Sequence, residues 1–88
     1  MDDKNLAAEL LREGYAHLYV RDDGPNIDYP EHQHRAESAH IILFGEMSMT
    51  MNGETRTYRA GERFDLPAGI RHSAKTGPEG CRYLIGER

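Results

Sequence analysis

The sequence predicts an all-β domain, a sandwich or barrel, with one short helix at its N-terminus. Two observations predict this class. Short alternating segments are separated by clusters of Gly, Pro, Asn and Asp at intervals of about 8–12 residues, as in antiparallel sandwiches and barrels. A helical period appears only over residues 5–13. Since the chain has 88 residues, we expect one domain over residues 1–88.

The expected helix covers residues 5–13. Leu6, Leu10 and Leu11 fall on one side of it, and Gly14 supplies the stop. Residues 15–88 are then expected to form the β-barrel, because the pattern changes to alternation directly after this glycine.

The first expected strand separates two sets of side chains. One face carries Ala16, Leu18 and Val20, and the other carries Tyr15, His17 and Tyr19. We expect the second set to form an aromatic outer face, which places His17 outside any site. Tyrosine-rich faces suit interfaces, and a small barrel exposes strand edges that a partner covers, so the sequence predicts a homodimer.

Asn52-Gly53 is the strongest hairpin signal in the chain. The strand before it alternates Ser48 and Thr50 with three methionines, Met47, Met49 and Met51. Because polar residues occupy the opposite face, we expect the thioethers to line the core and not to bind copper.

Charge and composition narrow the functional classes. Eleven Lys and Arg against 15 Asp and Glu give a net charge of −4 with no concentrated basic segment, which disfavours nucleic-acid binding. No stretch approaches the roughly 18 apolar residues of a membrane span, and the first residues lack the positively charged start and long apolar run of a signal peptide. We therefore expect a cytoplasmic protein that binds no membrane. The single cysteine, Cys81, excludes an internal disulfide and is expected to be half-buried in the last strand.

Histidines are the residues best suited to chemistry, and the chain has five. On extended chain, His32 and His34 point to the same side about 6–7 Å apart, which suits two imidazoles converging on one metal ion. Taken alone, this pair fits two surface histidines in a polar loop equally well. Farther along, Pro67 ends a strand and Gly69 permits a backbone reversal that aims His72 inward.

These residues resemble the two sequence motifs of the cupin superfamily, which comprises small metal-binding barrels. The second motif is a glycine, five residues, Pro-x-Gly, two residues and a histidine. It is matched without a gap by Gly61, Pro67, Gly69 and His72, and the first motif is matched at His32, His34 and Gly45. The resemblance covers about residues 27–88. It implies a cupin-type double-stranded β-helix, or jelly-roll barrel, with a mononuclear metal site.

Ser38 stands where the first motif has a glutamate. Glu37 is adjacent but faces away in a regular strand, so it reaches the site only through a bulge. His40 shares the face of Ser38, about 6.6 Å further along. We expect the metal ligands His32, His34, His40 and His72, with Glu37 and then water as alternatives to His40. Without a carboxylate, the site suits one divalent transition metal, iron, nickel, zinc, manganese or copper, better than magnesium or calcium.

Three functions remain open at this stage. An enzyme of the dioxygenase or isomerase type would use open metal positions to act on a small polar metabolite. A non-catalytic module would bind or sense a small ligand. Alternatively, a structural metal would stabilise a barrel with a small core. A degenerate cupin whose histidines hold no metal is a further alternative. Glu37, Tyr58 and Tyr83 are candidates for acid–base work, although each is expected to be a surface or packing residue.

Overall fold

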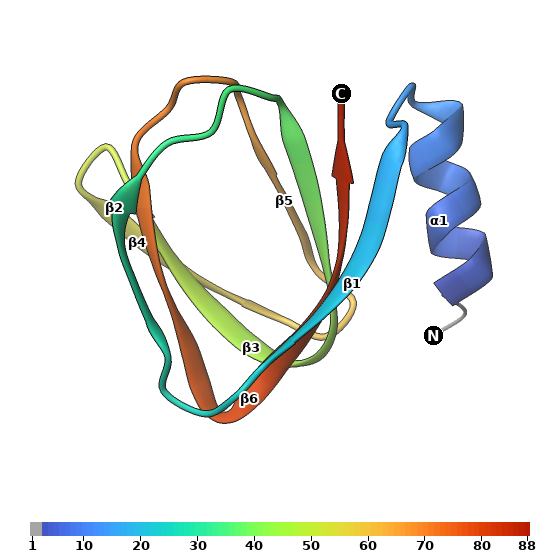
Figure 1. Cartoon of the computed structure of the whole chain (residues 1–88). Coiled ribbons are helices and arrows are strands. Elements are labelled where there is room, and N and C mark those ends of the chain that lie inside the picture. The colour runs from blue at the N-terminus through green and yellow to red at the C-terminus, as the bar shows by residue number, and fades with distance from the viewer. Residues whose placement is uncertain (1–2) are drawn as a thin grey trace.

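The structure is a computed structural model that describes residues 3–88. The described chain forms one helix, α1 (Asp3–Arg12), and six strands: β1 (His17–Asp23), β2 (Asp28–His32), β3 (Ser38–Met51), β4 (Glu54–Arg59), β5 (Arg63–Leu66) and β6 (His72–Glu87). The strands form one antiparallel sheet that curls on itself, and α1 lies outside it beside β1 (Figure 1). The predicted all-β jelly-roll class with a short N-terminal helix is confirmed. Within these residues, no helix is both long and apolar enough to cross a membrane.

The long strands β3 and β6 organise the barrel. They pair from Ser38↔Glu87 to Thr50↔Ser73, with irregularities between Ile42 and Phe44 and between Gly45 and Met47. The first part of β6 also pairs with β2, and its last part pairs with β1. Likewise, β3 pairs first with β5 and then with β4. Each long strand therefore spans both halves of the barrel.

Two apolar clusters lie on opposite sides of this sheet. The larger fills the barrel with Ile42, Met47, Met49, Tyr58, Phe64, Leu66, Cys81, Tyr83 and Ile85. The smaller lies between α1 and the sheet and comprises Leu10 of α1 with Tyr15, Ala39, Ile41 and Leu84. Burial of each large apolar side chain contributes about 1.5–3 kcal/mol relative to exposure. Met47 and Met49 are buried and Met51 packs against them, which confirms the predicted core stripe. Cys81 is fully buried, at 3% exposure, and not half-buried as expected.

The predicted orientation of the first strand is wrong. Tyr15 is only 1% exposed and packs beneath α1, so it belongs to no aromatic outer face. Ala16 and Val20 are exposed. His17 is exposed as expected, and Tyr19 is 43% exposed but lines the cavity at the mouth of the barrel. Alternation separates two faces but does not say which one is inside. Because α1 covers part of the outer face, that face needs apolar side chains as well.

Glycine is required at two places in β3 and the turn after it: in the β3–β4 hairpin, and at Gly45, where β3 lies close to β6. Asn52 and Gly53 both have positive φ and connect Met51 to Glu54, which confirms the predicted hairpin. Gly45 also has positive φ, at 74°, and a Cβ there would overlap the carbonyl oxygen of Gly80. The first-motif glycine thus permits the close contact of β3 with β6.

We predict that Gly45→Ala destabilises the protein by more than about 3 kcal/mol, since backbone strain and overlap each cost about 1–3 kcal/mol. Gly53→Ala is the matched control, because Gly53 has a φ of 77° but a Cβ there would meet nothing within 4 Å. It should cost only about 1–2 kcal/mol. Urea unfolding followed by circular dichroism measures both changes. Equal losses of stability in the two variants would show that the close contact of β3 with β6 at Gly45 does not matter for stability.

The homodimer stays a prediction, now for a different surface. Exposed apolar side chains on the outside include Val20 of β1 and Phe44 of β3, at 44% and 53% exposure. Sedimentation equilibrium should give twice the 10.0 kDa of one chain, and Val20→Glu should shift the equilibrium toward the monomer. A wild-type protein that sediments as a 10.0 kDa species at micromolar concentration would overturn the prediction.

Candidate metal centre

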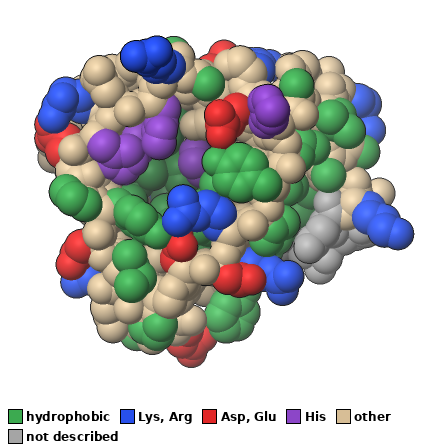
Figure 2. Space-filling view, viewed as in Figure 1, with side chains coloured by type: hydrophobic (Ala, Val, Ile, Leu, Met, Phe, Trp, Pro, Cys, Tyr) green, Lys and Arg blue, Asp and Glu red, His purple; other side chains and the backbone are tan. Residues whose placement is uncertain are grey.

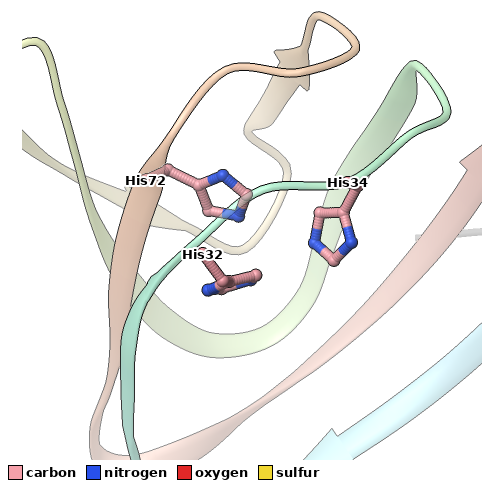
Figure 3. Close-up of side chains that lie close together, drawn as sticks. All are labelled: His32, His34 and His72. Carbon is pink, nitrogen blue, oxygen red and sulfur yellow. The ribbon is translucent and has the colours of Figure 1, made fainter.

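Three of the predicted histidines meet at the mouth of the barrel. His32 ends β2, His34 lies in the following loop, and His72 begins β6 directly opposite His32 in the β2–β6 pair. One ring nitrogen from each residue lies within 4.8 Å of the other two. Their rings lie around one region of space (Figure 3). The structure thus brings together residues that are up to 40 positions apart in the sequence.

Two loops hold this arrangement. The backbone N–H of Gly69 donates to the carbonyl oxygen of His34 at 2.8 Å, which joins the loop after β2 to the loop before β6. Gly69 has a φ of 78°, and the Ile70 N–H donates to the Pro67 carbonyl within the same turn. The backbone reversal predicted at Gly69 is therefore present, and it delivers His72 to the other two histidines.

Hydrogen bonds fix which nitrogens are available. His32 Nδ1 lies 2.7 Å from the Pro30 carbonyl oxygen, and His72 Nδ1 lies 3.3 Å from the Ile70 carbonyl oxygen. Because a carbonyl oxygen only accepts, Nδ1 carries the hydrogen in both rings. In a neutral ring, the Nε2 lone pair is then left for a ligand, which is the usual arrangement of metal-binding histidines.

Burial differs among the three residues. His72 is 4% exposed, and this burial lowers the pKa of its ring. A neutral imidazole is the form that binds a metal. His32 is half-buried and His34 is exposed, so the cluster opens to solvent on one side. Figure 2 shows histidine side chains beside a hollow in the molecular surface.

The three histidines share a cavity of about 100 Å³ with further residues of β2 and β6 and with residues of β1, β3 and β5. Polar side chains around it are Tyr19, Arg21, Tyr29, His40 and Tyr83. Its apolar walls are Met47, Met49, Phe64, Leu66, Ala74 and Ile85. No Asp or Glu lines the cavity in the described part of the chain.

His40 lines the same cavity but stands outside the three-histidine group. Its Nε2 lies 2.9 Å from Ser38 Oγ, which confirms that these two residues share a face. Its ring stacks on Phe64 at 4.5 Å between centroids, and its Nδ1 is buried without a hydrogen-bond partner. Burial lowers the pKa of His40 to about 3. A neutral ring with one unpaired polar atom therefore faces the barrel interior.

Glu37 is held elsewhere. Its carboxylate accepts from Arg88 Nη2 at 2.9 Å, and the backbones of the two residues exchange hydrogen bonds. The bond from Arg88 lowers the pKa of Glu37. Arg88 also lies 4.3 Å from the ring centroid of Tyr15, beneath α1. Glu37 thus faces away from the cavity, as expected for a regular strand.

Tyr58 and Tyr83 are both buried, as packing residues are expected to be. Tyr83 also donates from its hydroxyl to Asp23 Oδ2 at 2.6 Å, and burial raises its pKa. Arg21 and Tyr29 also border the cavity and were not predicted from the sequence. For Arg21 the signal was the alternation that places residues 19, 21 and 23 on one face.

Comparison with known proteins assigns the family. A family model described as a cupin domain matches residues 16–85, and the chain belongs to this family. No curated protein matches the chain.

Solved structures support the same fold. DMSP lyase DddQ from Ruegeria pomeroyi DSS-3 aligns with a TM-score of 0.73 and 32% identity, over 81% of this chain and 36% of that chain. This chain therefore spans about a third of that protein's length. KdgF from a Halomonas species aligns with a TM-score of 0.67 and 20% identity, covering 81% and 67% of the two chains. The cupin domain of Schizosaccharomyces pombe Cnp3 aligns with a TM-score of 0.73 and 22% identity, over 80% of this chain and 50% of that chain. The last two likenesses show the fold alone.

We predict that His40 makes the metal-free protein sensitive to acid. Its pKa is about 3 when folded and 6.5 ordinarily, so between these values the unfolded chain binds more protons. The free energy of unfolding should therefore fall as the pH falls from about 6.5 toward 3. His40→Gln should make urea midpoints at pH 7 and pH 4.5 more alike. His72 acts in the same direction, so some acid sensitivity should remain.

The matched control is His17→Gln, because His17 is exposed and outside the cluster. This variant should retain the acid sensitivity of the wild type. An unchanged difference between the two midpoints in His40→Gln would show that His40 is not the source.

Proposed function

We propose that His32, His34 and His72 bind one divalent transition metal, and that this centre acts on a small polar molecule in the adjoining cavity. The observation that carries the proposal is the convergence of three ring nitrogens within 4.8 Å. The carbonyl partners of His32 and His72 support it, because they leave Nε2 of each ring as the donor.

The donor set indicates the kind of metal. Three imidazoles without a carboxylate suit iron, nickel, zinc, manganese or copper, and suit magnesium or calcium poorly. When bound, such a metal supplies Lewis-acid or dioxygen chemistry at its open positions. The exposed side of the cluster, at His34, gives a small molecule access to those positions.

The chain's own residues would position the molecule. A cavity of about 150 Å³ is enough for benzene, so the 100 Å³ here suits a molecule of a few heavy atoms. Tyr83 stays protonated because its pKa is raised, and Asp23 accepts its hydrogen. Tyr19 and Tyr29 border the same space, where the Tyr19 hydroxyl donates to Glu87 Oε1 at 2.9 Å and the Tyr29 hydroxyl accepts from Arg21 at 3.2 Å. We expect these fixed rings to orient a polar ligand against the apolar walls.

We propose an enzyme acting on a small polar metabolite in the cytoplasm. The 32% identity to a DMSP lyase supports lyase chemistry, beside the isomerase and dioxygenase types that the sequence left open. The second candidate is a binding or sensing module without turnover. It is favoured by one observation: no carboxylate, the commonest alternative to histidine as a general base, lines the cavity among residues 3–88.

We predict that His32→Ala, His34→Ala and His72→Ala each weaken zinc binding by more than about 100-fold, since each removes one of three donors. Elemental analysis after dialysis should find stoichiometric zinc in the wild type and almost none in these variants. His17→Ala is the control and should bind zinc as the wild type does. Full occupancy in His72→Ala would place the metal at another site.

The fourth protein ligand is proposed to be His40, which borders the cavity and has an unpaired Nδ1. We predict that His40→Ala weakens zinc affinity by about tenfold or more, as loss of one donor should. Glu37→Ala should leave it unchanged, because Arg88 holds that carboxylate. Calorimetric titration with zinc measures both. A loss of affinity only in Glu37→Ala would contradict His40, and unchanged affinity in both variants would assign the position to water.

A further inference from the structure

Arg21 is the cationic side chain of the cavity. It projects from β1 beside Tyr83 of β6, its partner in the strand register, and borders the same space as the three histidines. The other described residues around this space are aromatic, apolar or histidine. A guanidinium stays charged at every physiological pH, so Arg21 gives the cavity a permanent positive charge.

Asp23 and Tyr29 orient this guanidinium from one side. Arg21 Nη2 lies 3.3 Å from Asp23 Oδ1 and 3.2 Å from the Tyr29 hydroxyl. The Asp23 side chain is 9% exposed, while that of Arg21 is 47% exposed. Both contacts use Nη2. The Nε–H and Nη1 hydrogens therefore have no partner among residues 3–88, and they are available to a ligand.

The charges around the cavity do not balance. Asp23 offsets one positive charge, but its other oxygen already accepts from Tyr83 at 2.6 Å. The three-histidine group contains no carboxylate, so a divalent metal there would keep its full charge. Since Asp23 offsets the charge of Arg21, the excess positive charge of the cavity would be that of the metal, in a partly apolar setting and beside the unpaired N–H groups of Arg21. A neutral or cationic ligand leaves this excess uncompensated, whereas an anion lowers the electrostatic energy.

We propose that the cavity binds a small molecule bearing a carboxylate, and that Arg21 recognises this carboxylate. The inference rests on the proposed function and deepens it by naming the substrate class. Guanidinium N–H groups form strong charge-assisted hydrogen bonds with carboxylate oxygens. The 100 Å³ volume limits the enclosed part of the ligand to a few heavy atoms.

The test uses the full chain loaded with zinc and titrated with acetate, while ¹⁵N NMR follows the backbone and arginine Nε signals. Acetamide has the shape of acetate without its charge and should bind at least about tenfold more weakly. Arg21→Gln should weaken acetate binding by about tenfold or more, because it removes the charged donors. The Arg21 Nε signal should shift with acetate in the wild type.

Arg82→Gln is the matched control. Arg82 lies on β6, pairs with Asp22 of β1 at 3.7 Å, and has a side chain 53% exposed, close to the 47% of Arg21. It does not border the cavity. This variant should bind acetate as the wild type does. If Arg21→Gln does not fold, Arg21→Lys replaces it, since lysine keeps the charge but loses the planar set of donors.

Zinc content measured on the same samples separates the two proposals. If zinc is bound and the Arg21 variant binds acetate as tightly as the wild type, the inference is overturned, because the metal alone then holds the anion. If the wild type binds no zinc, the metal proposal fails. Acetate binding by the metal-free protein that is lost in Arg21→Gln would still support the carboxylate site, and its persistence would overturn it.

Discussion

The antiparallel pairing of β3 with β6 is the constraint on which the rest of the structure depends. Both strands span the two halves of the barrel, so each pairs with two shorter strands in turn. The close contact at Gly45 and Gly80 lets the pair pass from one half to the other. Because β6 begins beside β2, His72 comes to lie opposite His32. The cluster of three histidines therefore follows from a strand register, and the loop containing His34 completes it.

Burial and charge set the properties of the histidines and of the cavity beside them. Burial of the His72 side chain and of the His40 ring lowers the pKa of both groups and favours their neutral forms, while His34 opens the cluster to solvent. Asp23 connects Tyr83 in the barrel to Arg21 at its mouth, so the cavity has one oriented cation and apolar walls below it. A divalent metal at the three histidines would add positive charge that Asp23 does not offset, and this supports the proposed anionic ligand. The same arrangement explains why Glu37, held by Arg88 outside the barrel, makes no contribution there.

The motifs of the sequence predicted the fold and the convergence of three histidines, because they encode local geometry. Gly69 has the positive φ that its turn requires, and His72 follows at a fixed spacing. The orientation of β1 was not predictable in this way, because alternation is symmetric between inside and outside. Tyr15 was assigned to the surface because the sequence does not show that α1 folds back over that side of the sheet. Arg21 and Tyr29 were missed because their meeting depends on which face of β1 points inward and on the pairing of β2 with β6.

X-ray absorption at the zinc edge of the loaded wild-type protein tests the central claim most directly, since it counts and identifies the atoms around the metal. The account predicts at least three imidazole nitrogens at about 2.0–2.1 Å, with the remaining positions filled by nitrogen or oxygen. His72→Ala should lose this imidazole signal. A sulfur shell at about 2.3 Å, or a shell of oxygen atoms without imidazole, would contradict a centre built on His32, His34 and His72.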